Sequence, residues 1–262
     1  MRKIFQYILM AVAVVVTASC SNELDEALQP ANNGTLQFVV SDFPTFGEST
    51  QTRAIGTHDE GKTAWANEDK ILVHLYSQKY GDQAVTLTFD AENNTWESDG
   101  GTLSYLENET LTITAVYAPD CEIKSDKTIG LLEGKKYGEA EYIPAKTTIS
   151  GNTLDISFES GRTYSRLRIA TMPGATLTVT TSGFTPDGPN GSTTPESYTL
   201  TTNANGNAFL YGTFAVGGSV TVLDESCVTA LAEYEFTEAT EPGKSYALYA
   251  GEKEEGDASP VR

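Results

Sequence analysis

The chain alternates between short apolar or half-apolar stretches and turn residues, and it has almost no helical periodicity. Residues 71–76 form a mostly apolar run that predicts a buried strand. Residues 85–89 alternate strictly between apolar and polar side chains, and residues 111–117 alternate again, which predicts strands with one buried and one exposed face. After residue 152, similar patterns recur at 154–158, 164–169, 177–180, 198–202, 208–214, 220–223 and 246–249.

The pair Asn205-Gly206 separates the stretches 198–202 and 208–214. Because Asn-Gly favours the backbone of a two-residue turn, we expect a β-hairpin at this point. Many short strands with regularly spaced turns are typical of β-sandwiches. The sequence therefore predicts an all-β fold, with two β-sandwich domains in tandem of transthyretin-like or Greek-key type.

Pro144 and Gly151 lie between two strand-rich blocks, and we place the domain boundary there. The N-terminal β-sandwich domain is expected at 35–148 and the C-terminal one at 149–250. The remaining residues, 251–262, are acidic, and we expect them to form a disordered tail.

Residues 1–19 have the features of an export signal: basic residues, an apolar run and then small side chains. The run leads to Cys20, where a lipobox-like site predicts a lipidated cysteine that anchors the chain. Thr17 departs from the usual Leu, and an ordinary signal peptide that contains a cysteine is the alternative. We expect residues 20–34 to form a polar, acidic linker.

The formal net charge of −19 argues against a nucleic-acid partner and against electrostatic binding to anionic lipid. This charge suits a soluble, secreted surface. Three cysteines are too few for a disulfide framework. Cys121 and Cys227 fall in different predicted domains, so a bridge between the domains and two free thiols are both open.

The sequence offers little for catalysis or for a metal. Of its two histidines, His58 lies in a polar loop and His74 lies within a predicted strand. Familiar metal-binding, nucleophile and phosphate-loop motifs do not occur, and residues 187–192 lack the spacing of a calcium loop. We therefore expect no enzyme, no cofactor and no metal site. Four aromatic residues are open to either a sugar-stacking or a core role: Trp65, Tyr76, Tyr80 and Trp96.

A short apolar strand opens the first domain, and a polar loop follows it and ends at Arg53-Ala54. An extended, accessible loop with a basic residue is a good substrate for a trypsin-like protease. A cut after Arg53 would let the strand leave, and the groove left behind would accept a strand from another chain. The alternative is a single exposed arginine in a linker. The residues of this removable strand are Leu36, Phe38 and Val40.

The order of these features resembles the fimbrillin-like family, which builds type V pili in anaerobic Gram-negative bacteria. The resemblance rests on the lipoprotein leader, the short strand and Thr52-Arg53-Ala54. It continues through segments with the family's order and spacing at 65–73, 94–96, 114–119, 142–145, 156–158 and 165–169. The chain departs from the family at Glu159-Ser160-Gly161, where members often have a histidine.

The resemblance implies a structural and adhesive pilus subunit without catalytic activity. The lipid on Cys20 would anchor the precursor in the outer membrane at the cell surface, and a trypsin-like protease would cut between Arg53 and Ala54. Other pilin subunits would then fill the vacated groove in a fimbrium. A second hypothesis is a permanently anchored surface lipoprotein that binds a glycan or a protein. The candidate donor strand, which could also be an ordinary last strand of its own domain, contains Tyr246, Leu248 and Tyr249.

Overall fold

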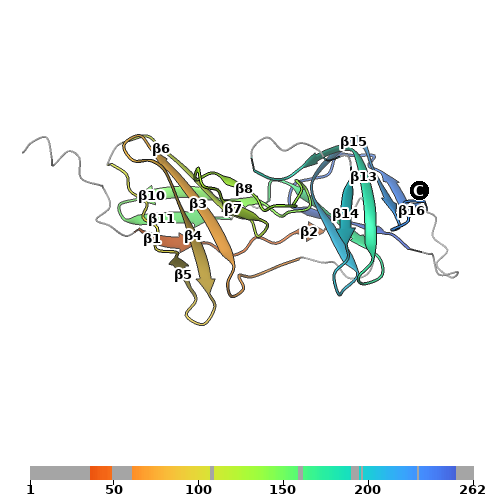
Figure 1. The fold of residues 1–262 in the computed structure, drawn as a ribbon, viewed down its shortest axis with the longest axis horizontal. Coiled ribbons are helices and arrows are strands. Elements are labelled where there is room, and N and C mark those ends of the chain that lie inside the picture. Colours follow the sequence, from red (N-terminus) through yellow and green to blue (C-terminus); the bar gives the residue numbers. More distant parts are fainter. Residues whose placement is uncertain are drawn as a thin grey trace, which may run out of the picture.

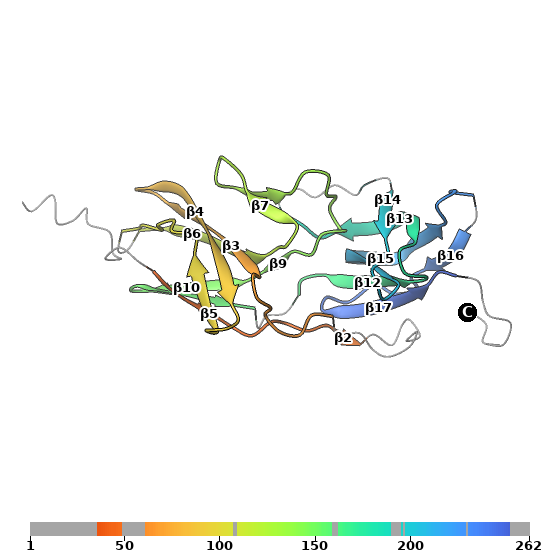
Figure 2. The same cartoon turned by 60° about the horizontal axis from the view of Figure 1, so that its bottom comes forward.

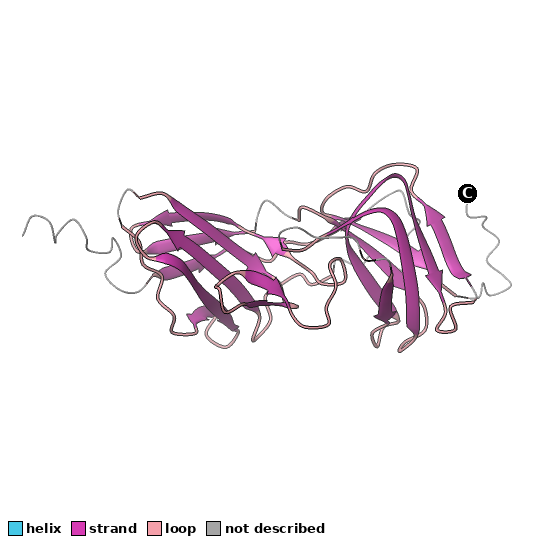
Figure 3. Ribbon diagram, turned by 45° about the horizontal axis from the view of Figure 1, so that its top comes forward, coloured by secondary structure: helices cyan, strands magenta, loops and turns pink. Residues whose placement is uncertain are grey.

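The computed structural model describes residues 36–48, 61–106, 109–158, 162–189, 195, 197–228 and 230–251. The described residues form strands, turns and loops without a helix, and Figure 3 shows strands in both halves of the molecule. The all-β prediction is therefore confirmed. Several predicted features lie outside the described residues: the leader (1–19), the linker (20–34) with Cys20, the cleavage site Arg53-Ala54 and most of the tail (251–262).

Two sheets pack face to face in the first sandwich. Its strands are β1 (Gln37–Val40), β3 (Lys70–Ser77), β4 (Gly81–Asp90), β5 (Thr95–Ser98), β6 (Leu111–Tyr117), β7 (Cys121–Ile123), β8 (Ile129–Leu131), β9 (Ile143–Pro144), β10 (Lys146–Ser150) and β11 (Thr153–Ser157). One sheet has the order β5-β4-β3-β6-β9 and the other β1-β11-β10, while β7 and β8 form a separate ribbon. β3, β4 and β5 are successive antiparallel neighbours, and β6 returns to pair with β3, which makes a Greek key.

The inner faces of the two sheets follow the alternation in the sequence. Ile71 and Leu75 of β3 are fully buried and share one apolar cluster with Ile156 of β11. Leu72 is also buried, but it belongs to a second cluster that packs against the β7–β8 ribbon. Because both faces of β3 are covered, this strand is mostly apolar where its neighbours alternate.

The structure corrects the domain boundary. The sequence analysis placed it at 148/149, but β10 and β11 pair with each other and β11 pairs with β1 of the first sandwich. Leu154, Ile156 and Phe158 all lie in the first core, so the chain passes to the second core only after Phe158. Gly151 has φ +56° and makes the turn between β10 and β11, so it marks a hairpin and not a linker.

The second sandwich is a single sheet that folds over itself. Its strands are β2 (Gly47–Glu48), β12 (Ser165–Ala170), β13 (Thr176–Pro186), β14 (Tyr198–Thr201), β15 (Asn207–Leu223), β16 (Ala230–Glu235) and β17 (Lys244–Tyr249). Their order is β14-β13-β15-β12-β17-β2, and β16 also pairs with β15. The first half of β15 pairs with β12 and its second half with β16, so one strand belongs to both layers around a shared apolar core.

Glycine residues lie where this sheet bends over itself. The ladder between β13 and β15 shifts register between Ser182 and Phe184, and Gly183 has φ +60° there. A side chain on Gly183 would come within 2.9 Å of the Cα of Gly218, so only glycine lets the two bent strands approach this closely. The predicted strands 208–214 and 220–223 are therefore one bent strand, β15, and not two.

The turn at Asn205-Gly206 also differs from expectation. Gly206 N–H donates to the carbonyl of Asn203 at 2.9 Å, so a tight turn is present. However, β14 and β15 flank β13 on opposite sides, so they do not form a hairpin with each other. Turn chemistry fixes the local backbone but leaves open which strands pair on either side of it.

One segment runs along both sandwiches. Residues 36–48, which we call the strap, contribute β1 to the first sandwich and β2 to the second. Figures 1 and 2 show the two sandwiches following each other along the long axis, and in Figure 2 the red-to-orange strap passes beneath both. The strap therefore contributes an outer strand to a sheet in each half of the molecule.

We expect Leu154→Ala to destabilise the first sandwich by about 2–5 kcal/mol, because it removes a fully buried side chain from the first core. Both tryptophans, Trp65 and Trp96, pack against that core, so urea unfolding followed by tryptophan fluorescence reports on it. The matched control is Leu210→Ala in the second core. If Leu154→Ala left the fluorescence transition unchanged, the β10–β11 hairpin would not belong to the first sandwich.

Candidate functional site

The predicted removable strand lies at the edge of a sheet. β1 pairs in parallel with β11, with Gln37 opposite Thr153 and Val40 opposite Ile156. Among the described residues, β1 has a strand neighbour on that side only. An edge strand can leave without breaking a sheet in two, and it exposes a single row of backbone groups when it does.

The side chains of β1 alternate as the sequence predicts. Leu36 is buried, and Phe38 and Val40 are half-buried and pack against the first core. Val39 is 54% exposed on the other face. The three residues singled out in the sequence therefore face inward together, but β1 itself is anchored only in part by burial.

Ser41 holds the strap where it leaves the sheet. Its backbone N–H donates to the carbonyl of Ile156 at 3.0 Å, and its hydroxyl accepts from the N–H of Phe158 at 2.8 Å. The indole N–H of Trp65 donates to the Ser41 carbonyl at 2.9 Å. These bonds extend the contact between the strap and the first sandwich beyond the last paired residue of β1.

Phe43 inserts into an aromatic pocket of the first sandwich. It is buried, and its ring meets Trp65 edge-on at a centroid distance of 4.8 Å and Tyr117 at 5.1 Å. Such edge-to-face pairs contribute about 0.5–1.5 kcal/mol beyond the burial of area. Phe43 is therefore a stronger anchor of the strap than the half-buried residues of β1.

Phe46 contacts two buried arginines. The guanidinium carbon of Arg162 is 3.7 Å from the centre of the Phe46 ring, and that of Arg166 is 4.4 Å away. Phe46 is 2% exposed, and the two arginines are 4% and 3% exposed. A cation over an aromatic face gains about 0.5–2 kcal/mol, more where water is excluded. We call Phe46, Arg162 and Arg166 the arginine clamp.

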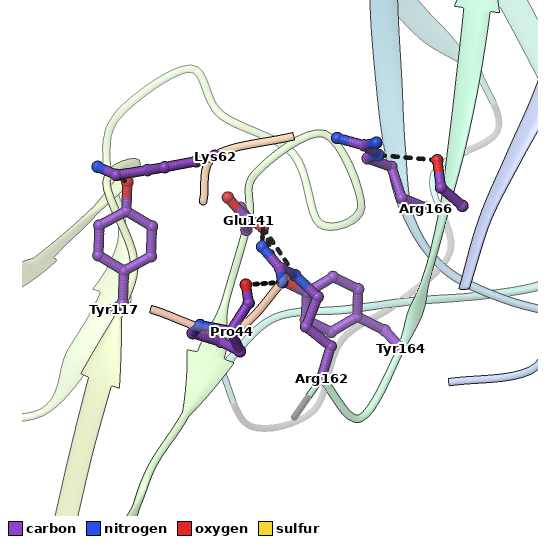
Figure 4. Close-up of polar contacts among 8 residues, drawn as sticks. Pro44, Lys62, Tyr117, Glu141, Arg162, Tyr164 and Arg166 are labelled. Atoms are coloured by element: carbon purple, nitrogen blue, oxygen red, sulfur yellow. Dashed lines mark hydrogen bonds and ion pairs between the residues drawn. The ribbon is translucent and has the colours of Figure 1, made fainter. Parts of the chain in front are cut away.

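Hydrogen bonds from both sandwiches fix the clamp. Arg162 donates from Nη2 to Glu141 Oε1 at 3.0 Å and from Nη1 to the carbonyl of Pro44, as Figure 4 shows. Glu141 also accepts from the hydroxyl of Tyr164 at 3.1 Å. A buried guanidinium is tolerated only when it is paired in this way. Arg162 therefore joins the strap to the first sandwich just before the chain enters the second.

The strap ends on the second sandwich. Gly47 N–H donates to the carbonyl of Gly243 at 2.8 Å, and β2 then pairs in parallel with the start of β17. Arg166 of the clamp donates from Nε to the hydroxyl of Ser245 on β17 at 3.1 Å. The last residues of the strap and the clamp thus share one edge of the second sheet.

Sequence reasoning missed the most buried anchors of the strap. Phe43 and Phe46 were read as part of a polar loop, although they are two aromatic residues three positions apart in a stretch with few other apolar side chains. That spacing was the available signal. Nothing near Arg162 and Arg166 in the sequence indicates that they would meet Phe46, because the contact joins segments more than a hundred residues apart.

The candidate donor strand lies inside its own sheet. β17 pairs with β12 on one side and with β2 on the other. Tyr246 is buried and Leu248 packs against the second core, whereas Tyr249 is largely exposed. In this structure, residues 244–249 thus form a strand of the second sandwich, held on its outer side by the strap.

Two cavities adjoin the strap. One of about 570 Å³ runs beside β1 and is bordered on its far side by Trp65 and Trp96. The other, of about 370 Å³, lies beside Phe46 and both arginines of the clamp. Of the four aromatics open to a sugar-stacking or a core role, Trp65 and Trp96 pack edge-on at 4.9 Å against the first core, whereas Tyr76 is exposed on β3.

The described residues hold no group of three His, Cys, Asp or Glu side chains that could bind a metal. His74 lies in β3, where its Nε2 is 2.9 Å from Asp82 Oδ1 of the neighbouring strand. Cys121 is buried and Cys227 is exposed, and neither forms a disulfide. Within the part of the chain that the structure describes, there is also no helix long and apolar enough to cross a membrane.

Comparison with known proteins gives one result of note. No protein-family model matches the chain, and neither does any curated protein. Among solved structures, a fimbrial protein from Bacteroides ovatus is similar. The two chains share 9% identity with a TM-score of 0.38, and the match covers 82% of this chain and 48% of that protein. This chain therefore spans about half the length of the structure that it matches.

A buried carboxyl lies where the two sandwiches meet. Asp187 follows β13, its backbone N–H donates to the carbonyl of Tyr211 at 2.9 Å, and its carboxylate accepts from the N–H groups of Gly188 and Tyr142. Its Oδ2 is buried and accepts no hydrogen bond within the described residues. Burial raises the pKa of Asp187 to about 7, and the charge of Glu141 acts in the same direction.

This raised pKa predicts how stability depends on pH. Because the folded pKa exceeds the unfolded one, the folded state binds the proton more tightly, and stability falls as the pH rises from about 4 to 7. Asp187→Asn should therefore lose less stability than the wild type between pH 5 and pH 8, measured by urea unfolding.

The matched control is Asp90→Asn. Asp90 is exposed, and hydrogen bonds from Asn93 lower its pKa, so it stays ionised throughout this pH range. Its variant should keep the pH dependence of the wild type. Equal slopes for Asp187→Asn and the wild type would show that the Asp187 carboxyl does not titrate in this range.

Proposed function

We propose that the chain is a structural and adhesive subunit of a cell-surface pilus, exported as a lipoprotein and assembled by protease-triggered strand exchange. The observation that carries the proposal is the position of the strap. It lies at the edge of a sheet in each sandwich, and it pairs there with strands that are far from it in the sequence. The predicted cleavage point, Arg53, lies five residues beyond the end of β2. A cut there would separate the strap from the rest of the chain, and with it Leu36, Phe43 and Phe46, which are buried in the first core.

Loss of the strap would leave a vacancy that another strand can fill. The backbone edge of β11 would lose its partner, and Leu154 and Ile156 in the core beneath it would lose the apolar cover of β1. Unpaired backbone groups and exposed apolar side chains both cost free energy, so a strand from another subunit would be stabilised there. Main-chain pairing would supply affinity and alternate side chains would set the register.

The uncut strap explains why the precursor would stay monomeric. It is covalently joined to its own groove, so its effective concentration there far exceeds that of any second subunit. Cleavage converts this intramolecular contact into a bimolecular one that a neighbour can displace. The protease would therefore control assembly without altering the fold of either sandwich.

The remaining parts of the proposal follow the sequence. Lipid on Cys20 would hold the precursor at the outer membrane, a trypsin-like protease would act at Arg53-Ala54, and other pilin subunits would be the partners. The donor would be the strand with Tyr246, Leu248 and Tyr249, whose outer edge the strap covers. The chain would bind no nucleic acid and would carry no catalysis.

Blocking the cleavage should block assembly. We expect Arg53→Ala to remain an uncut monomer and Arg53→Lys, which keeps a basic residue for a trypsin-like protease, to be cut and to polymerise. Gels run without boiling would show ladders for the wild type and for Arg53→Lys only. N-terminal sequencing of the surface form should begin at Ala54. Polymers of Arg53→Ala would contradict the proposal, and a working form that begins at an acylated Cys20 would favour the permanently anchored lipoprotein.

A disulfide across the strap should separate cleavage from exchange. Val39 and Asp155 are directly paired between β1 and β11 and lie on the exposed face. Neighbouring strands lie about 4.8 Å apart, which is within the range that a disulfide spans. We expect oxidised Val39→Cys/Asp155→Cys, in a Cys227→Ser background, to be cut but to form no polymers until it is reduced.

The single variant Val39→Cys, in the same background, is the control and should polymerise under both conditions. Polymers from the oxidised double variant would show that assembly does not need the strap to leave. This outcome would contradict strand exchange while leaving the cleavage itself intact.

A further inference from the structure

Two kinds of contact hold the strap, and they restrict the amino-acid sequence of the bound strand to different degrees. Along β1 the contact is a backbone ladder with β11, and Phe38 and Val40 are only half-buried. A backbone ladder accepts most side chains. At the other end, Phe46 is buried and contacts Arg162 and Arg166, whose guanidinium carbons both lie within 4.4 Å of the ring centre. Selectivity for an occupant is therefore concentrated at the clamp.

We infer that the vacated cleft selects an incoming strand by an aromatic side chain that takes the place of Phe46 against Arg162 and Arg166. This inference rests on the function proposed above and names the chemistry of the partner. The occupant is an extended segment of another subunit that places an aromatic ring at the position of Phe46. An aliphatic residue at that position fills the space but leaves the two cations without an aromatic face.

The physical reason lies in the burial of both cations. With Phe46 in place, each arginine is less than 5% exposed. An aromatic ring presents negative charge density on its faces, and this charge density attracts the guanidinium groups that lie near the ring. A leucine or valine has no such charge density, so each cation loses a favourable contact.

The two arginines of the clamp also have partners outside the strap. Arg162 is bound by Glu141, and Arg166 is bound by Ser245 on β17. Phe209 also lies near Arg166, with its ring centre 5.2 Å from the guanidinium carbon. Arg162 would lose its bond to the Pro44 carbonyl when the strap leaves, but these other contacts would still restrict both cations, which reduces the entropy lost when a ring binds.

The aromatic pocket of Phe43 makes a different demand. It presents ring edges from Trp65 and Tyr117, and Phe43 lies farther from Arg162, at 5.4 Å, than Phe46 does. We therefore place the aromatic requirement at Phe46. A hydroxyl group is tolerated there, because a cavity of about 370 Å³ adjoins the ring.

Peptide exchange into the cut protein tests the inference. The chain is cut after Arg53 and incubated with an excess of fluorescein-labelled peptide of residues 36–53, and binding is followed by fluorescence anisotropy. Peptides with Phe46→Tyr, Phe46→Leu and Phe38→Leu are compared with the natural sequence. We expect Phe46→Leu to bind at least tenfold more weakly, and Phe46→Tyr and Phe38→Leu to bind within about threefold of the natural peptide.

Arg166→Met provides the matching change in the protein. It keeps most of the side chain's length but removes the charge, and the preference for the natural peptide over Phe46→Leu should shrink from tenfold or more to about threefold or less. If Arg166→Met fails to fold, the peptide series on the wild-type protein still decides the question.

The outcomes separate this inference from the proposed function. Equal binding of the natural and Phe46→Leu peptides, with exchange still occurring, would overturn the aromatic selection alone. Failure of every peptide to enter the cut protein would overturn strand exchange and the inference with it. A preference for Phe46 that persists undiminished in folded Arg166→Met would overturn the role of the clamp.

Discussion

The parallel pairing of β1 with β11 is the contact that holds the strap at the edge of the first sandwich. It joins residues 37–40 to residues 153–156, so the strand that holds β1 comes more than a hundred residues later in the sequence. β3, β4, β5 and β6 form a complete Greek key among themselves, and β10 supports β11 from the other side. The strap closes a sandwich that is already connected, and this makes it separable in physical terms.

The two sandwiches do not depend on the strap alone for their connection. A loop between β8 and β9 reaches the second sandwich, where Gly138 N–H donates to the carbonyl of Asp187 at 3.1 Å and its carbonyl accepts from Tyr211 N–H at 2.6 Å. Lys136 also donates to the carbonyl of Ser197 at 2.9 Å. These bonds and the Arg162–Glu141 pair involve no strap residue, so a cut chain would retain a defined junction between its halves.

The pattern of apolar and polar residues predicted those strands whose positions depend mainly on neighbouring residues in the sequence. The alternation at 111–117 predicted both ends of β6, and the apolar residues of 71–76 lie on a strand with two covered faces. The boundary, the long bent β15 and the clamp were not predictable in this way. Each depends on which distant segments of the chain meet. Gly151 is equally compatible with a linker between domains and with a turn within one. A glycine within β15 suggests the end of a strand, because the sequence does not show that the partner strand β13 bends at the same place.

The pairing of β2 with β17 also connects the strap to the candidate donor strand. β17 carries the candidate donor residues, and its outer edge is covered by β2 of the strap. If the strap leaves, β17 changes from an inner strand with two neighbours to an edge strand paired with β12 alone. An edge strand separates at a lower cost in backbone hydrogen bonds than an inner one. One cut would then open the acceptor groove in the first sandwich and loosen the candidate donor in the second, so that only cut subunits would become competent at both ends.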